Sequence, residues 1–372
     1  MSRIVPATVA SMPWALIALL TGLSLFGTAV LYSAADGSMR PWALSHLLQF
    51  VVFLGAALFV RTLRLDTIRL LVMPAYVGSL LLLVLVEVIG QAGGGSQRWL
   101  NLGFMTLQPS ELMKLAIILA LARFYELIPP ATTNTWAAIW PALLLMALPA
   151  GLVLIQPDLD TALILIVGGA VVMFLAGLPL RIFVMAGGAV AAIAPLAYFF
   201  ALKDYQRNRL GSFLDPESDP LGTGYHAIQS KIAIGSGGLF GKGFLNGTQG
   251  HLDYLPEHHT DLVFATLFEE WGLIGGLALL LVYFWLFRWG YRTAANAPSR
   301  FGKLTAAGLT TTLFFYVAMN MLTATAITPI MGVPLPLISH GGSAMMTIML
   351  LVGIIMAIER DTQKGGAAQA LS

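Results

Sequence analysis

Long apolar stretches, separated by short polar or charged segments, make up most of this chain. A helix needs about 20 mostly apolar residues to cross roughly 30 Å of hydrocarbon. Cutting the sequence at charge clusters and at Gly/Pro breaks therefore predicts about ten membrane-spanning helices. They cover residues 12–33, 44–60, 69–90, 107–128, 136–155, 159–177, 181–202, 262–288, 304–328 and 341–358. Residues 136–177 are also compatible with one re-entrant unit that is broken at Gln156-Pro157-Asp158.

The composition agrees with lipid as the main solvent. Of the 372 residues, 58% are hydrophobic and only 10% are charged, and the mean hydropathy is +0.82. A soluble domain carries about 25% charged residues, so we predict a single all-α polytopic membrane domain over residues 1–372. The net charge of +2 gives no reason to expect a nucleic-acid partner. The chain has no cysteine, which excludes disulfides, thiol catalysis and cysteine metal sites.

Basic residues in the short loops predict the orientation of the helices. With the N-terminus inside, the cytoplasmic side collects Arg3, Arg61, Arg64, Arg69, Arg123, Arg181, Arg288, Arg292, Arg300, Lys303, Arg360 and Lys364. The opposite short loops hold only Arg40 and Arg98. Lys and Arg accumulate in cytoplasmic loops, so both termini are expected in the cytoplasm. The apolar run from Met12 to Leu31 exceeds the core of a signal peptide, and we expect it to be retained as the first helix.

This orientation places the longest polar segment, residues 203–260, on the outer side. Loops of this length are usually functional or disordered. Ile228 and Ile232 lie at helical spacing, which predicts short amphipathic helices at the bilayer surface. The glycine-rich run 235–243 lacks the spacing of a nucleotide-binding loop. Its backbone amides could still cradle a pyrophosphate, with Lys231 or Lys242 as the countercharge.

Ionisable side chains inside the predicted spans are candidates for function, because burying them in lipid is costly. Glu111 and Lys114 are three residues apart and therefore share one face of a helix. They are compatible with a structural ion pair or with a polar cavity for the charged head of a lipid substrate. Glu269 and Glu270 lie in the eighth span, where a polar lumen and structural contacts explain them equally well.

Asp261 is predicted to head the eighth span, directly after Leu255-Pro256-Glu257-His258-His259-Thr260. An acid at a helix N-terminus can simply cap the helix and interact with its dipole. It can also act as a catalytic base at the outer membrane face. A zinc site built from His258 and His259 with nearby acids is disfavoured, because adjacent side chains in an extended segment point in opposite directions.

Six short motifs together resemble the SEDS family of cell-wall proteins. They are Arg98-Trp99-Leu100, QPSELMK (108–114), Gln156-Pro157-Asp158, the stretch 205–244 that begins YQRNRLGSFLDPESDP, LPEHHTDLVFATLFEEWG (255–272) and MGVPLPLISHGGS (331–343). The YQRNR and MGVPLP forms resemble the RodA-like elongation branch more than the FtsW-like division branch. Two positions depart from the family pattern: Asp160 replaces a glycine, and His340 replaces a tyrosine.

The resemblance implies a peptidoglycan glycosyltransferase that polymerises lipid II into β-1,4 glycan strands at the outer face of the inner membrane during cell elongation. It implies that Asp261 is the general base and that Glu111 and Lys114 line a central cavity. The remaining candidate substrate contacts are Arg98, Arg209, Lys242, Glu257, Ser339 and His340. No resident metal is implied, although Mg²⁺ or Mn²⁺ could help to neutralise the pyrophosphate.

The expected partners are lipid II, a single-span class B penicillin-binding protein and other membrane proteins of the elongation complex. A lipid II flippase, a non-catalytic scaffold and an FtsW-like division paralogue are the alternatives. A flippase needs comparable access from both membrane faces. Here Asp261, the long loop and the segment 335–343 all gather on the outer side, which favours the enzyme.

Overall fold

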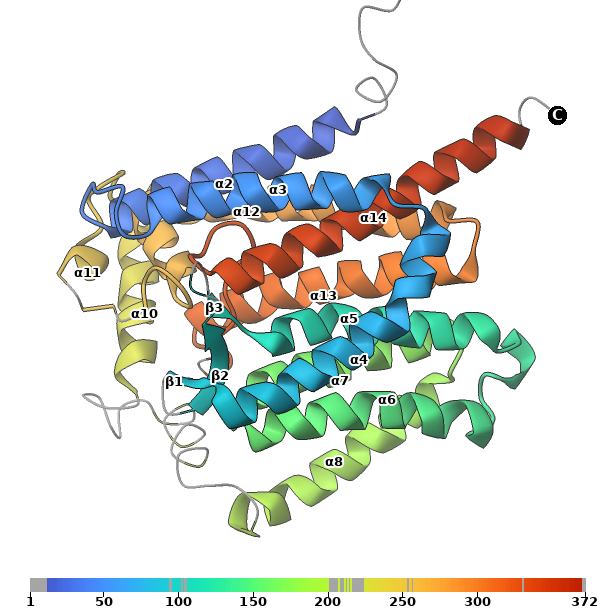
Figure 1. The fold of residues 1–372 in the computed structure, drawn as a ribbon. Helices are drawn as coiled ribbons and strands as arrows, with labels where there is room; N and C mark the ends of the chain where they lie inside the picture. The colour runs from blue at the N-terminus through green and yellow to red at the C-terminus, as the bar shows by residue number, and fades with distance from the viewer. Residues whose placement is uncertain are drawn as a thin grey trace, which may run out of the picture.

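Ten long helices form one bundle in the computed structural model of the chain (Figure 1). The structure describes residues 12–93, 96–101, 103, 106–200, 207, 211, 213, 215, 224–252, 254–255, 257–329 and 331–369. The bundle helices are α2 (Trp14–Ala34), α3 (Ala43–Thr62), α4 (Leu65–Ile89), α5 (Pro109–Leu127), α6 (Trp136–Ile155), α7 (Leu159–Ala176), α8 (Leu180–Phe200), α12 (Val263–Asn296), α13 (Arg300–Ala324) and α14 (Gly342–Gln369).

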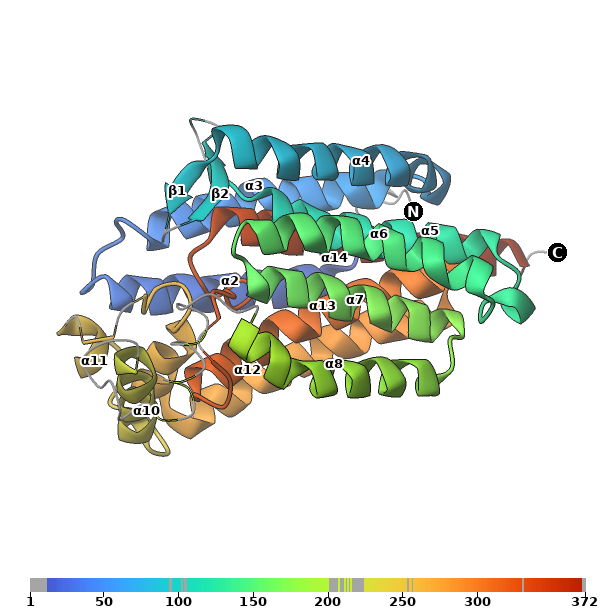
Figure 2. The ribbon, with the colours of Figure 1, turned by 90° about the horizontal axis from the view of Figure 1, so that it is seen from below.

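Each bundle helix corresponds to one predicted span, which confirms a multi-pass membrane protein. Eight of them, within the described residues, are long and apolar enough to cross a bilayer by length and composition. The other two are α5, which carries Glu111, Lys114, Arg123 and Glu126, and α8, whose apolar stretch is shorter. The segment 136–177 consists of two full-length helices, α6 and α7, which lie side by side in Figure 2. It is therefore not one re-entrant unit.

The helices differ in how many of their side chains are buried, and α5 is the central helix of the bundle. Most side chains of α5 are buried on all sides, because α4, α6, α7, α13 and α14 surround it. The peripheral helices direct large apolar side chains outward, such as Leu70, Val88 and Met185, whose side chains are mostly exposed. In a bilayer these side chains contact lipid, and the helices satisfy their backbone hydrogen bonds internally.

The two ends of the bundle differ. The described parts of both termini lie at one end, which we call the terminal end (Figure 1). The other end, called here the loop-rich end, carries α10 (Tyr225–Gly237), α11 (Thr248–His251) and three short strands. The strands β1 (Gln91–Gly93), β2 (Ser96–Asn101) and β3 (Thr106–Leu107) pair antiparallel in the order β1-β2-β3. The sequence analysis predicted no strands.

Helix α10 runs across the bundle axis at the loop-rich end (Figures 1 and 2). The residues it buries are all small: Ala227, Ser230, Ala233 and Gly237. A side chain at Gly237 would collide with the Phe268 carbonyl oxygen, at 2.1 Å from its Cβ, so α10 packs directly against the backbone of α12. Ile232 is 45% exposed on the other side. Of the two isoleucines that predicted an amphipathic helix, Ile232 therefore faces away from the bundle, and Ile228 is half-buried.

Helix α12 is broken at Gly272, where φ is 63° and ψ is −163°. The break frees carbonyl groups of the preceding turn, and the glycine-rich segment 237–243 binds them. Lys242 N–H donates to the Glu269 carbonyl (2.9 Å), and Gly243 N–H donates to the Glu270 carbonyl (3.0 Å). Past the break, Leu273 N–H donates to the Gly238 carbonyl (3.0 Å). The glycine run thus completes the hydrogen bonds of α12, and these amides are not available to cradle a pyrophosphate.

Candidate active site

Asp261 lies at the loop-rich end, two residues before α12 begins at Val263. It belongs to the turn 257–262, so it precedes the helix instead of standing in its first turn, and Leu262 occupies the N-cap position. The residue is partly exposed. The side chain of Asp261 is therefore accessible to a substrate, while its backbone carbonyl is hydrogen-bonded within the protein.

Asn320 of α13 holds the backbone at Asp261. Its side-chain amide donates to the Asp261 carbonyl (2.9 Å) and to the Val333 carbonyl (2.8 Å). Asn320 is fully buried, and one side chain thus joins the turn 257–262 to the loop 331–341. Because buried hydrogen bonds resist exchange with water, this amide fixes both loops relative to the bundle.

The loop 331–341 makes two further bonds to the same turn. Ser339 Oγ donates to the Thr260 carbonyl (2.6 Å) and accepts from Leu335 N–H (2.8 Å). The backbone N–H of His340 donates to the His259 carbonyl (2.9 Å). Three consecutive carbonyls, at His259, Thr260 and Asp261, are therefore bound by protein donors. Ser339 and His340, both predicted to contact substrate, support the turn 257–262 in the structure, and a contact with substrate stays a prediction.

Two histidines anchor the turn on its other side. The ring nitrogens of His258 lie 2.9 Å from the Leu255 carbonyl and 3.1 Å from the Ala34 carbonyl, at the end of α2. His259 stacks on Trp42, with ring centroids 4.0 Å apart and an angle of 10° between the planes. Burial, reinforced by neighbouring His258, lowers the pKa of His259 to about 4. Burial also lowers the pKa of His340, so both rings are neutral at pH 7.

A second carboxylate faces the same loop as Asp261. Asp160, in the first turn of α7, accepts a hydrogen bond from Gly332 N–H (3.4 Å). A Cβ placed on Gly332 would lie 3.6 Å from Asp261 Oδ2, so both acids adjoin this exposed glycine. Asp160 is one of the two departures from the family pattern. It therefore adds negative charge beside Asp261 where a glycine would add none.

Arg98, predicted to contact substrate, is placed on β2 next to the turn between α6 and α7. Its guanidinium donates to the Gln156 carbonyl (3.2 Å) and to the Pro157 carbonyl, and it lies 3.8 Å from Asp158 Oδ1. Asp158 in turn accepts from Thr161 N–H (3.2 Å) and caps α7. Arg98 thus supports the turn that leads to Asp160, and a contact with pyrophosphate stays a prediction.

Lys242 is also engaged by protein. Its ammonium lies 2.6 Å from Glu269 Oε1 and 2.7 Å from the Thr248 hydroxyl. Glu269 is fully buried and also accepts from the backbone N–H groups of Thr248 (3.0 Å) and Gln249 (3.2 Å). Ser33 of α2 donates to the neighbouring acid, Glu270. Glu269 therefore holds the segment 242–249 onto the bundle and Glu270 bonds to α2, which favours structural contacts over a polar lumen.

Glu111 and Lys114 form a closed group with Tyr316 of α13. Lys114 Nζ lies 2.6 Å from Glu111 Oε1 and 2.7 Å from the Tyr316 hydroxyl, which donates to the other oxygen of Glu111. The side chains of Glu111 and Lys114 are only 5% and 3% exposed. Because the three groups satisfy one another, the geometry favours the structural ion pair. A role in lipid binding stays a prediction.

Of the two remaining predicted residues, the structure describes one, at the edge of this site. Glu257 is exposed, and its carboxylate accepts from the Thr260 hydroxyl (2.8 Å). Arg209 lies outside the described residues. Asn320 and Trp42 were missed, although an asparagine inside an apolar span is itself a signal, because such polar groups need a buried partner. Among the described residues, no group of three or more His, Asp or Glu side chains is arranged to hold a metal ion.

Comparison with known proteins identifies the chain. The model of the FtsW, RodA and SpoVE family of cell cycle proteins matches residues 10–364. This chain belongs to that family. It is 49% identical to peptidoglycan glycosyltransferase MrdB of Escherichia coli over 285 residues, 76% of each chain. It is 34% identical to a probable peptidoglycan glycosyltransferase FtsW of Trichlorobacter lovleyi, over 95% of this chain and 94% of that one.

Solved structures of the FtsW, RodA and SpoVE family share this fold. A chain of a peptidoglycan synthase complex, in which polymerization and crosslinking are coordinated, superposes with a TM-score of 0.82 at 34% identity. The match covers 95% of this chain and 98% of that chain. RodA, the rod shape determining protein of Thermus thermophilus, superposes with a TM-score of 0.67 at 30% identity, over 94% and 97% of the two chains. The predicted fold and family are thereby confirmed.

Proposed function

We propose that this chain is a peptidoglycan glycosyltransferase that polymerises lipid II, with Asp261 as the general base. The observation that carries the assignment is the partly exposed Asp261 carboxylate on a turn whose three successive carbonyls are bound by protein donors. Such fixation keeps a catalytic group in reacting geometry without cost at the moment of reaction. The glycosyltransferase relatives, up to 49% identical, support the same reaction class.

The chemistry requires a base at the position proposed for Asp261. The reaction moves a sugar from an undecaprenyl pyrophosphate donor to the 4-hydroxyl of an acceptor sugar. Asp261 takes the hydroxyl proton as the oxygen attacks the anomeric carbon and the pyrophosphate leaves. A positioned base contributes roughly 10²–10⁴ in rate. Conversion of an α-linked pyrophosphate into a β-1,4 bond is an inversion, so one displacement suffices and no covalent enzyme intermediate is needed.

The departing pyrophosphate needs positive charge, which a divalent cation such as Mg²⁺ or Mn²⁺ would supply. Mg²⁺ sites at phosphates commonly use one or two carboxylates together with phosphate oxygens and water. Asp160 and Asp261, which both adjoin Gly332, fit this donor set. Asp160 would hold the ion, and Asp261 would stay available for the proton.

The orientation in the membrane follows from charge. The terminal end carries the basic clusters of the α3–α4 turn and of α12 to α14, including Arg64, Arg292 and Lys303. The positive-inside rule puts this end in the cytoplasm. Asp261 then faces the outer side of the inner membrane, where lipid-linked disaccharide would be polymerised.

The inferred partner is a class B penicillin-binding protein. The support is the structural match to a chain of a peptidoglycan synthase complex that coordinates polymerization with crosslinking. A polymerase that releases long strands needs a transpeptidase close by, and a permanent membrane complex supplies it. The RodA-like assignment within the family is supported by 49% identity to MrdB of Escherichia coli over 285 residues, against 39% to an FtsW relative over 291 residues.

Reconstitution of the purified chain in liposomes tests the function. Fluorescent lipid II would be supplied to the chain alone and with its penicillin-binding partner, whose transpeptidase is blocked. We expect a ladder of glycan polymers on gels. Transfer of intact lipid II across the bilayer without any polymer, in either combination, would replace the enzyme assignment with that of a flippase.

A further inference from the structure

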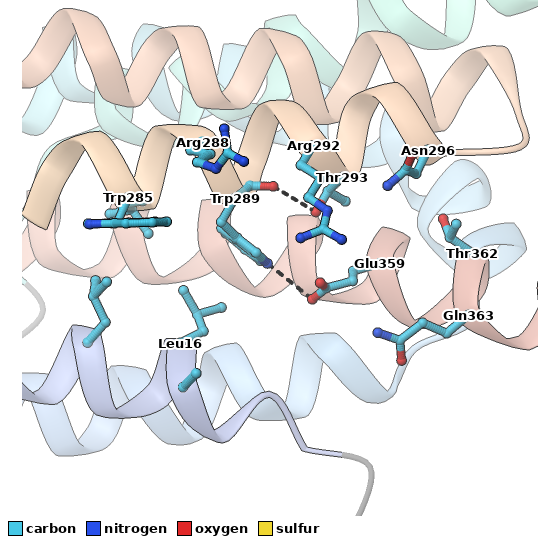
Figure 3. A pocket seen from close by; sticks show the side chains of 13 residues that line it. Leu16, Trp285, Arg288, Trp289, Arg292, Thr293, Asn296, Glu359, Thr362 and Gln363 are labelled. Atoms are coloured by element: carbon cyan, nitrogen blue, oxygen red, sulfur yellow. Dashed lines mark hydrogen bonds between the residues drawn. The ribbon is translucent and has the colours of Figure 1, made fainter.

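A cavity of about 580 Å³ opens at the terminal end of the bundle, between α2, α12 and α14 (Figure 3). It lies far from the candidate active site. At 1.5 Å per residue, the 28 positions from Asp261 to Trp289 correspond to roughly 40 Å along α12. The cavity therefore plays no part in the chemistry proposed above, and its lining needs its own explanation.

The lining combines an apolar wall with two cations. Leu16 and Leu19 of α2 and Trp285 of α12 form part of the apolar lining. Arg288 and Arg292 lie one turn apart on α12, and the Arg288 guanidinium is 6.0 Å from the Trp285 ring centre. In the described part of the chain, no carboxylate lies within ion-pair distance of either guanidinium. The cavity thus has net positive charge at an apolar surface.

One acid, Glu359, also borders the cavity, and it already has partners. Glu359 of α14 accepts a hydrogen bond from the indole N–H of Trp289 (3.1 Å; Figure 3). Arg61 of α3 interacts with it electrostatically. The side-chain amides of Asn296 and Gln363 complete the polar rim (Figure 3). Glu359 therefore does not cancel the attraction of both arginines for an anion.

An apolar groove continues from this cavity along the same two helices. It measures about 370 Å³ and is lined by α2 and α12 residues, among them Leu19, Gly22, Phe26, Gly275 and Ala278. Leu19 borders both spaces. The small residues leave room for a chain between the helices. A cationic cavity that leads directly into an apolar groove matches a ligand with an anionic head and a hydrocarbon tail.

We propose that an anionic phospholipid of the inner leaflet binds here, with its phosphodiester on Arg288 and Arg292 and one acyl chain between α2 and α12. Arginine pairs with phosphate through several charge-assisted hydrogen bonds. Basic pockets between membrane helices on the cytoplasmic side are typical sites for such head groups. The inference rests on the orientation proposed above and is independent of the glycosyltransferase reaction.

Native mass spectrometry of the purified full chain tests this site. The chain in detergent would be titrated with phosphatidylglycerol, phosphatidylcholine, undecaprenyl phosphate or inorganic phosphate. We expect one phosphatidylglycerol to bind at least about tenfold more tightly than phosphatidylcholine. The double variant Arg288→Gln, Arg292→Gln should lose this preference. The control Arg181→Gln, Lys303→Gln, which removes two exposed charges from α8 and α13, should keep it.

A groove variant tests the acyl chain separately. A Cβ at Gly22 would meet no atom within 4 Å, so Gly22→Leu fills the groove without a clash. It should weaken phosphatidylglycerol binding about tenfold with both arginines intact. Gly55→Leu on α3 is the matched control, because its Cβ also meets no atom within 4 Å.

Four results would overturn the proposal. The first is equal binding of phosphatidylglycerol and phosphatidylcholine, and the second is unchanged binding in the double arginine variant. The third is tighter binding of undecaprenyl phosphate than of phosphatidylglycerol, which would assign the site to a polyprenyl lipid. Competition by inorganic phosphate at equal concentration would likewise refute a lipid site, because it would make the acyl groove irrelevant. Size-exclusion profiles identical to wild type would show that each variant is folded.

Discussion

At the scale of single residues, Asn320 is the clearest support of the turn that carries Asp261. Asn320→Ala removes two buried hydrogen bonds, each worth about 1–1.5 kcal/mol. We expect kcat for lipid II polymerisation to fall at least about tenfold, with a smaller change in KM, because the base is displaced while the substrate pocket remains.

A matched control for Asn320 lies on the same helix. Thr312 is equally buried, but its hydroxyl bonds within α13, to the Gly308 carbonyl (3.0 Å). Thr312→Val should leave kcat within about twofold of wild type. Similar losses of kcat in both variants would mean that Asn320 acts through general stability of α13, not through the turn.

His259 makes stability depend on pH. Its pKa is about 4 in the folded protein, against 6.5 for an unperturbed histidine. The unfolded chain therefore binds a proton first, and the stability contributed by the neutral ring is complete above pH 6.5 and is lost as pH falls toward 4. His259→Phe keeps an aromatic ring on Trp42 but cannot take up the proton.

Thermal unfolding in detergent at pH 7.5, 6.5, 5.5 and 4.5 measures this effect. The midpoint of wild type should fall more steeply with decreasing pH than that of His259→Phe. A residual slope is expected from His340, whose pKa is also lowered by burial. Parallel curves for the two proteins would show that His259 is not the titrating group.

The sequence was sufficient to select candidate site residues but not to predict their hydrogen-bond and ion-pair partners. Asp261 was singled out by its motif and its place at the head of a span, and the Glu111–Lys114 pair because charged groups in apolar spans are conspicuous. The partners of Arg98 and Lys242 were not foreseen, because they come from segments 58 and 27 residues away. Only the three-dimensional contacts reveal that these cations already bind protein carbonyls or Glu269.

At the scale of elements, the break in α12 depends on two glycines in contact. Gly272 has φ of +63°, and a Cβ there would lie 2.4 Å from Gly241 N. Gly272→Ala should therefore destabilise the protein by about 1–3 kcal/mol, seen as a lower unfolding midpoint. Gly151→Ala in α6 is the control, because its Cβ meets no atom within 4 Å. Equal midpoints for the two variants would contradict this account of the break.

The long helices could be predicted because each needs only its own apolar pattern. The break at Gly272 and the strands β1 to β3 could not, for a physical reason. A three-residue strand such as Gln91–Gly93 has too few positions for an alternating pattern. The helix break is stabilised by residues 237–243, which are distant in sequence. Both features depend on tertiary contacts that local propensity does not encode.

At the scale of the whole molecule, the group of Glu111, Lys114 and Tyr316 connects the first two turns of α5 to α13. Lys114→Met leaves a buried carboxylate unpaired and should cost about 3–5 kcal/mol. The double variant Glu111→Gln, Lys114→Met removes both charges and should recover most of that stability. Unfolding midpoints of the single and double variants measure the difference.

The same two variants separate a structural pair from a substrate site. If the pair is structural, the folded double variant should polymerise lipid II at near wild-type rates. Stability restored by the double variant with activity still abolished would mean that these side chains contact substrate. The sequence alone left both interpretations open. A spacing of three residues shows that Glu111 and Lys114 share a helix face, but it does not show which other residues contact that face.

The central claim is that Asp261 is the base of a lipid II polymerase, and one assay tests it directly. Wild type, Asp261→Asn and Asp36→Asn would be compared for polymerisation of purified lipid II in liposomes, each with the penicillin-binding partner. Asp36→Asn removes an exposed charge at the same end of the bundle. We predict polymer from wild type and Asp36→Asn, and a loss of at least about 10²-fold for Asp261→Asn with an unchanged unfolding midpoint. Full polymerisation by Asp261→Asn would contradict the account and remove this carboxylate from the mechanism.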